Sequence, residues 1–323
     1  MVYTAIEMTD LRQSKSYAKY LKSQGWTIER KNGVNYFLKK VPILGYILKV
    51  QRPKKLFINS ISEAWPPSVV NQLINKYKPY LISIEPNDNK QIDLLIANDY
   101  RLTTNAFLPT KTLRIDLTKS VKQITADFDK RLMSKIIRGS KVKTKIYTTT
   151  NEIKIFQKAW KNSVNLSRNV LNVDQLLSIK NSYQQNDSLL LASHNINSRV
   201  IGGALFTICR EIDDIVCYYW YGFTNKEGRA LLSQFSLMYQ AILWAKNRGC
   251  KVFDFEGIYD DRFPKKDWLG FTRFKKEFGG YEISYPGCYV KYNLLNVIAN
   301  EVKQSQALSR LLRLFTPRNN TRN

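Results

Sequence analysis

The sequence predicts an α/β protein with two tandem domains, each built around a mixed β-sheet. The chain has 323 residues, which is too long for a single core of usual size. Hydrophobic residues make up 44% of the chain and aromatic residues 12%, enough to build buried cores. Segments with strand and helix patterns follow one another in a similar order in both halves, although no repeat is visible at the level of residues.

The first half predicts a helix, a hairpin, and then alternating strands and helices. The first helix covers 16–24 and ends at Gly25, because glycine accepts the left-handed conformation of a C-cap. Asn32-Gly33 predicts the two-residue turn of a hairpin. The remaining elements are a strand at 43–50, a helix from the proline pair at 66–67 to about 78, a strand at 81–86, a helix at 92–100 and a strand at 112–117.

A long basic helix is predicted over 120–140. Phe128, Leu132, Ile136 and Ile137 form its apolar stripe. Its cations are Lys122, Lys130, Arg131, Lys135 and Arg138, and the series continues with Lys141, Lys143 and Lys145. Two interpretations stay open: a solvated basic face, or contact with phosphate groups of a partner.

The second half predicts the same order of elements. Helices at 151–168 and 173–185 precede strands at 188–193, 200–209 and 215–224, an amphipathic helix over 231–245 and a strand at 251–258. This order matches two tandem GNAT-like domains. We expect domain 1 at 1–148, completed by a C-terminal helix at 290–323, and domain 2 at 149–289.

The segment 270–287, GFTRFKKEFGGYEISYPG, predicts a short basic helix, a stop and a strand. Phe271, Phe274 and Phe278 share one helical face, and Gly279-Gly280 ends the helix. This segment resembles the C-terminal signature of the FemABX family, aminoacyl-tRNA-dependent peptidyltransferases that build peptidoglycan cross-bridges.

The resemblance extends over nearly the whole chain. Matching motifs are Gln13-Ser14 with Lys22 and Gly25-Trp26, the acid–proline pair at Glu85, the P-x-x-T-L run from Pro109, the basic helix end at Lys135 and Arg138, Tyr219-x-Tyr221-Gly222, and the D-F-x-G-I run from Asp254. Only Arg52-Pro53 remains of the family's P-R-G-P loop. The chain lacks the sustained heptads of a coiled-coil arm, so it resembles the compact FemX-type members.

The resemblance implies transfer of an aminoacyl group from charged tRNA to the stem amine of UDP-MurNAc-pentapeptide or lipid II. An ester is already activated, so the reaction needs no serine or cysteine nucleophile, only proximity and a donor for the oxyanion. The residues implied are Lys275 for the oxyanion or a precursor phosphate, Glu85 as proton acceptor or orienting group, Lys22 and Arg52 for pyrophosphate, and Phe274, Trp26, Tyr219, Tyr221 and Arg138 for substrate contacts.

Charge and composition indicate the partners. The net charge of +25 points to a polyanion such as nucleic acid, phosphate groups or an anionic membrane surface. The four scattered cysteines indicate buried residues in a reducing compartment. Without a secretory signal or an apolar run of membrane-spanning length, we expect a cytoplasmic monomer, with peripheral contact at the inner face of the membrane as an alternative. We expect no metal and no cofactor, with aminoacyl-tRNA as co-substrate, and no catalytic role for His194.

Two other function classes remain at this stage. An acyl-CoA-dependent N-acyltransferase would need a pyrophosphate-binding loop. The segment 199–204 has the letters of that loop but begins a predicted strand, whereas 225–230 has the right place but starts with Asn225. A non-catalytic RNA-binding or membrane-binding protein would need only the charge. The sequence does not name the amino acid transferred, the stem position, or the form of the acceptor.

Overall fold

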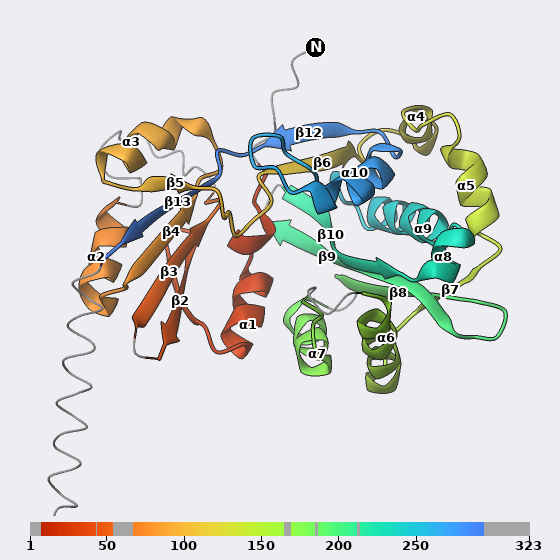
Figure 1. The fold of residues 1–323 in the computed structure, drawn as a ribbon, viewed down its shortest axis with the longest axis horizontal. Coiled ribbons are helices and arrows are strands. Elements are labelled where there is room, and N and C mark those ends of the chain that lie inside the picture. Colours follow the sequence, from red (N-terminus) through yellow and green to blue (C-terminus); the bar gives the residue numbers. More distant parts are fainter. Residues whose placement is uncertain are drawn as a thin grey trace, which may run out of the picture.

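The computed structural model describes residues 8–42, 44–53, 67–164, 169–184, 187–211 and 214–293. They form two lobes side by side, each built on a mixed sheet (Figure 1). The first sheet has the order β1-β2-β3-β4-β13-β5 and the second the order β12-β6-β11-β10-β9-β8-β7. The predicted pair of mixed-sheet domains is confirmed. In the described residues the longest helix has 15 residues, so none forms a coiled-coil arm.

The first lobe follows the predicted elements closely. Its strands are β1 (Thr27–Lys31), β2 (Val34–Val41), β3 (Gly45–Gln51), β4 (Leu81–Glu85), β5 (Arg101–Thr103) and β13 (Cys288–Tyr292). Its helices are α1 (Lys15–Ser23), α2 (Pro67–Tyr77) and α3 (Ile92–Ala97). Asn32 and Gly33 both have positive φ, as the predicted hairpin turn requires. Apolar residues of β2, β3 and β4 pack with Val70, Leu73 and Leu95 of α2 and α3 to form this lobe's core.

The second lobe has helices on both faces of its sheet. Its strands are β6 (Lys111–Asp116), β7 (Lys143–Ile146), β8 (Ser188–His194), β9 (Val200–Glu211), β10 (Asp214–Thr224), β11 (Val252–Gly257) and β12 (Tyr281–Ser284). Its helices are α4 (Val121–Ala126), α5 (Leu132–Gly139), α6 (Thr150–Ser163), α7 (Val173–Ser182), α8 (Lys226–Ala230), α9 (Ser233–Asn247) and α10 (Leu269–Lys276). Residues of α4, α5 and α9 pack on one face, and residues of α6 and α7 on the other.

The two sheets do not divide the chain at residue 148, where the sequence suggested a boundary. Strands β6 and β7 and helices α4 and α5 all precede that residue but belong to the second lobe. In the other direction, β13 returns to the first sheet and pairs antiparallel with both β4 and β5 (Figure 1). Residues 290–292 therefore lie in a strand and not in the expected C-terminal helix, and 294–323 lie outside the described residues.

The prediction of one long helix over 120–140 is also wrong, because this segment forms two helices, α4 and α5. The backbone N–H of Asp129 donates to the carbonyl of Glu277 at 2.8 Å, so the linker between the helices bonds to the end of α10. The side chain of Asp129 accepts a hydrogen bond from the N–H of Arg131, just before α5 begins. A tertiary contact and a local side-chain bond together interrupt the helix that the apolar spacing favoured.

The N-terminal segment joins the lobes. Met8, Leu11 and Tyr20 are buried in the second lobe's core, with Trp160 and Leu176 of α6 and α7. The segment nevertheless leads directly into β1 of the first sheet. Packing of these residues therefore fixes one lobe against the other.

The end of α10 gives a stability prediction. Gly280 has φ +92°, and a Cβ there would lie 2.2 Å from the carbonyl oxygen of Arg114. Gly280→Ala should lower the free energy of unfolding by about 3 kcal/mol, because strained backbone and a backbone clash add together. Gly270→Ala is the matched control, since the added carbon would meet no described atom within 4 Å outside its chain neighbours and the backbone of its own helix. Urea unfolding that showed equal effects for both variants would contradict this account.

Candidate functional site

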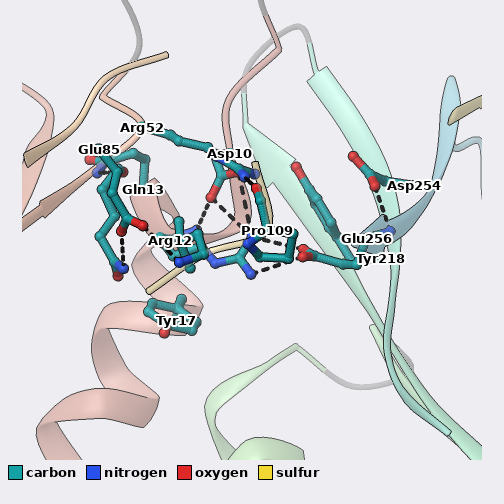
Figure 2. A network of polar contacts seen from close by, with 12 residues as sticks. Asp10, Arg12, Gln13, Tyr17, Arg52, Glu85, Pro109, Tyr218, Asp254 and Glu256 are labelled. Carbon is teal, nitrogen blue, oxygen red and sulfur yellow. Dashed lines mark hydrogen bonds and ion pairs between the residues drawn. The ribbon is translucent and has the colours of Figure 1, made fainter. Parts of the chain in front are cut away.

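A buried polar network occupies the junction between the lobes (Figure 2). At its centre, Asp10 accepts a hydrogen bond from Nη1 of Arg52 at 3.0 Å and from the backbone N–H of Arg12 at 2.9 Å. Burial acts to raise the pKa of Asp10, but the two guanidinium groups and these hydrogen bonds outweigh it and hold the pKa below its ordinary value. Asp10 is therefore an ionised carboxylate shared by two arginines.

Arg12 connects this network to the second sheet. Its Nη1 and Nη2 donate to the two carboxylate oxygens of Glu256 at 2.7 and 3.0 Å, a bidentate pair between residues 244 apart in the chain. Glu256 lies in β11 with φ 58°, where the register against β6 shifts between Asp254 and Gly257. This irregular backbone turns the Glu256 side chain toward the first lobe, as Figure 2 shows.

Asp254 is engaged separately, within the second sheet. It accepts hydrogen bonds from Nε of Arg114 at 2.8 Å and from the backbone N–H of Glu256 at 2.7 Å, and also from the hydroxyl of Thr112. The two acids of β11 are thus each paired with an arginine. The part of the chain that the structure describes contains no group of three His, Cys, Asp or Glu side chains placed to hold a metal ion.

Lys275 of α10 contacts the backbone on both sides of Glu256. Its Nζ donates to the carbonyl oxygens of Phe255 at 2.7 Å and Gly257 at 2.5 Å, the residues on either side of Glu256. The side chain lies against the rings of Phe271 and Tyr219, with Nζ 4.9 and 5.5 Å from the centroids. Burial lowers the pKa of Lys275 to about 8, although the charges of Glu256 and Asp254 act in the opposite direction.

A pocket of about 590 Å³ lies between β10, the start of α9 and α10. The parallel strands β10 and β11 pair with each other only at Val216–Tyr218 of β10. Beyond Tyr218, β10 pairs with β9, and beyond Asp254, β11 pairs with β6. Aromatic side chains of Tyr219, Phe235, Phe271 and Phe274 line the pocket, with Gln234 and Arg229 among its polar residues. Gln234 is 9% exposed, and its Oε1 has no hydrogen-bond partner among the described residues. The pocket therefore offers aromatic faces and one unsatisfied buried acceptor.

The family model of the FemAB family matches residues 125–295, more than half of the chain. The chain belongs to the FemAB family. No match is found among curated proteins. A crystal structure of FemX is similar to this chain, with 18% identity, a TM-score of 0.71, and coverage of 93% of this chain and 94% of that one.

Other solved structures share the fold with lower similarity. L-PGS from Bacillus licheniformis is 13% identical with a TM-score of 0.53, covering 91% of this chain and 97% of that one. A tandem GNAT protein from the clavulanic acid biosynthesis pathway is 8% identical with a TM-score of 0.52, covering 81% of each chain. These structures confirm the predicted tandem GNAT-like fold. Family membership supports a Fem-type acyltransferase.

The FemAB-type F-K motif and the first tyrosine of the Y-x-Y-G motif come together at the pocket. Phe274 and Tyr219 line it, and Lys275 lies against the Tyr219 ring. Tyr221 lies elsewhere, since it packs with Trp160 and Trp220 in the core on the α6–α7 side. The reason is an irregularity in β10 between Tyr219 and Tyr221, which breaks the alternation of sides that a regular strand would give. Of these two tyrosines, Tyr219 lines the pocket and Tyr221 does not.

Glu85 and Arg52 belong to the junction network. The Glu85 carboxylate accepts hydrogen bonds from Nε2 of Gln51 and from the backbone N–H of Leu108, both at 2.7 Å, and burial raises its pKa. Arg52 is 3% exposed, bonded to Asp10 and to the carbonyl of Pro109, and stacked 3.5 Å over the ring centroid of Tyr285. Its buried guanidinium is committed to these contacts, which speaks against the pyrophosphate contact suggested from the sequence.

The remaining predicted residues lie at separate places. Lys22 is exposed on α1, and Arg138 is exposed on α5. Trp26 follows α1 and lies near Lys39 and Lys49, with their amines 5.9 and 5.5 Å from its ring centroid. His194 ends β8. Its Nε2 is 2.6 Å from the hydroxyl of Tyr147.

Sequence reasoning missed Arg12, Asp10 and Gln234. One usable signal was present: Glu256 stands in the apolar run VFDFEGI, and a buried carboxylate there requires a cation. The identity of that cation could not be deduced, because Arg12 comes from the far end of the chain. Gln234 gave no signal, since a glutamine at the start of a helix is ordinary.

Proposed function

We propose that this protein transfers an aminoacyl group from charged tRNA to the stem amine of a peptidoglycan precursor. Membership of the FemAB family supports the reaction class. The observation that carries the proposal is the aromatic pocket at the point where β10 and β11 part, with Lys275 buried beside it. The proposed co-substrate is aminoacyl-tRNA alone, without a further cofactor.

The pocket suits the 3′-terminal adenosine of the donor. Aromatic faces stack on bases, and Phe271, Phe274, Phe235 and Tyr219 supply such faces. The unpartnered Oε1 of Gln234 would accept a hydrogen bond from the exocyclic amine of adenine. Arg229 also lines the pocket and is exposed, so it would meet the 5′ phosphate of this adenosine.

The chemistry needs few protein groups. The neutral acceptor amine forms a bond to the ester carbonyl carbon, the oxyanion develops, and the tRNA 3′ oxygen then leaves with a proton that the amine gives up. Lys275 has three N–H donors and uses two on backbone carbonyls, so the third would stabilise the oxyanion. Both oxygens of Glu85 already accept hydrogen bonds, which favours an orienting role over proton transfer.

The segment 225–230, where an acyl-CoA-dependent enzyme would have its pyrophosphate-binding loop, gives little support to that alternative. Asn225 is the N-cap of α8, and its Oδ1 accepts a hydrogen bond from the backbone N–H of Gly228 at 2.8 Å, so this amide is already satisfied. A pyrophosphate would need such amides free. Residues 226–230 themselves form α8, a helix of only 5 residues.

The proposed acceptor is UDP-MurNAc-pentapeptide or lipid II, in the cytoplasm or at the inner face of the membrane. Within the described residues, no helix combines the length and the apolar character needed to cross a bilayer. We infer a monomer acting on a precursor that it meets in solution or at the membrane surface.

The test is transfer of label from a mixed pool of charged tRNAs to each precursor in parallel. We expect labelled product with one acceptor. Failure with both acceptors, together with saturable binding of acetyl-CoA, would overturn the proposal in favour of an acyl-CoA-dependent enzyme.

Gln234→Met tests the donor pocket. Loss of the buried acceptor should raise the KM for charged tRNA about 10-fold, which corresponds to one hydrogen bond of about 1.4 kcal/mol, and leave the KM for the precursor unchanged. Gln240→Met is the control, because Gln240 is an exposed glutamine on the same helix. A rise in the precursor KM alone would show that the pocket holds the other substrate.

A further inference from the structure

The pocket between β10, α9 and α10 contains a carboxylate that the proposed function does not yet use. Asp267 lines the pocket from the 3₁₀ helix η3 (Lys266–Trp268), which leads directly into α10. Asp267 is exposed, and among the described residues it has neither a hydrogen bond nor an ion pair. The nearby Lys265 does not neutralise it, since its amine lies over the ring of Trp268, 5.2 Å from the centroid.

The charged lining of this pocket consists of one anion and one cation. The cation is Arg229 of α8, for which we infer contact with the 5′ phosphate of the terminal adenosine. Asp267 comes from a different element and would repel such a phosphate. Binding of the tRNA backbone therefore gives no reason for an acid in this lining, whereas a ligand that also carries a positive charge does.

The aminoacyl end of a charged tRNA carries such a charge. Its α-amino group is an ammonium when protonated, and the side chain of a basic amino acid supplies a second one. Phe271 and Phe274 line the same pocket, and Phe271 follows Asp267 by four residues. Aromatic ring faces attract cations, so a carboxylate beside such rings suits an ammonium group.

The position of Asp267 relative to Lys275 agrees with this assignment. The two residues are eight positions apart in the sequence, and a helix rises 1.5 Å per residue, so they lie roughly 12 Å apart along the axis of α10. Both side chains extend into the space between these ends. One aminoacyl group could therefore place its ester carbonyl near Lys275 and direct an ammonium toward Asp267.

We propose that Asp267 binds an ammonium group of the aminoacyl donor. The inference rests on the proposed function and adds a specificity-determining residue to it. Uncharged tRNA has no such ammonium, so Asp267 would favour charged tRNA over the uncharged product. The ammonium is either the α-ammonium or that of a basic side chain.

Asp267→Asn tests the site, because it removes the charge of an exposed residue and keeps its shape. The first probes are 3′-deoxyadenosine with alanine joined to a 3′-amino group, and its N-acetylalanyl form. If the α-ammonium is bound, isothermal titration should show that wild type binds the alanyl probe about 5-fold more tightly than the N-acetylalanyl probe, the upper end for a solvent-exposed ion pair. Asp267→Asn should bind both probes equally.

A second pair of probes distinguishes the two sources of the ammonium. The lysyl and norleucyl forms of the same nucleoside have side chains of similar length, but only the lysyl form carries a side-chain charge. A preference of wild type for the lysyl probe that Asp267→Asn abolishes identifies the side-chain ammonium. A preference for the alanyl probe over its N-acetyl form that Asp267→Asn abolishes identifies the α-ammonium.

Asp261→Asn is the matched control. Asp261 precedes the pocket residue in the same connection between β11 and α10, its side chain is 81% exposed, and its loss removes the same charge. Asp261→Asn should bind every probe as wild type does.

The outcomes also separate this inference from the proposed function. Equal affinities of wild type and Asp267→Asn for each of the four probes, with transfer intact, would overturn the ammonium site and leave the aminoacyltransferase standing. A wild-type protein that binds none of the probes and transfers no label would overturn both.

Discussion

Glu256→Gln should lower the free energy of unfolding by about 3 kcal/mol, the largest stability effect that we expect from a polar substitution. The carboxylate of Glu256 meets both terminal nitrogens of Arg12, and the arginine side chain is only 5% exposed. Removing Glu256 leaves the buried charge of Arg12 with only Asp10, whose Oδ1 is 3.4 Å from Nη1 and which Arg52 also shares, to compensate it in a region of low dielectric. Urea or thermal unfolding of the two proteins measures the difference.

The control is Glu29→Gln, which removes the same charge from a surface pair. Glu29 bonds to Lys76 at 2.8 Å, but the lysine side chain is 61% exposed, so water screens the interaction. We expect almost no change in stability. The double variant Glu256→Gln with Arg12→Met should recover part of the loss, because the under-compensated charge of Arg12 is removed and Asp10 keeps its pair with Arg52. Equal losses in Glu256→Gln and Glu29→Gln would show that the lobes do not depend on this pair.

Lys275→Met should reduce the transfer rate by about 100-fold or more, the size of effect seen when an oxyanion donor is removed. The substitution removes the proposed donor and also releases the carbonyls of Phe255 and Gly257 that hold the turn at Glu256. Lys276→Met is the matched control, because Lys276 is exposed and its amine pairs with Glu282 at 2.6 Å. Transfer assays with charged tRNA measure both variants. Retention of full activity in Lys275→Met would remove Lys275 from the mechanism.

The pH dependence of stability tests the burial of Lys275 without any substrate. Burial lowers its pKa from 10.5 to about 8, so between these values the unfolded chain binds more protons at this residue than the folded protein does. Folding stability attributable to Lys275 therefore rises as the pH increases from about 8 toward 10.5. The difference in unfolding free energy between wild type and Lys275→Met should shift in favour of wild type over that interval. A difference that does not change with pH would contradict the lowered pKa.

Local patterns predicted most of the elements, because their causes are local. The Asn32-Gly33 turn, the helix from the proline pair and the Gly279-Gly280 stop each depend on the backbone preferences of a few neighbouring residues, and each is found in the structure. The exceptions arose where another part of the chain intervened. Contact with the end of α10 divides the helix predicted over 120–140, and an irregularity in β10 turns Tyr221 away from the pocket.

By itself, the sequence determined the mixed α/β character, the tandem organisation and the family, through periodicity and the order of short motifs. It also brought out Lys275 and Phe274, since the F-K motif is contiguous. Only the tertiary structure decided that β6 and β7 join the second sheet, that β13 returns to the first, and that Arg12 meets Glu256. These pairings join residues far apart in the chain. The ion-pair partner of a buried charged residue such as Glu256 is determined by how the two sheets pack and not by the residues next to it in the sequence.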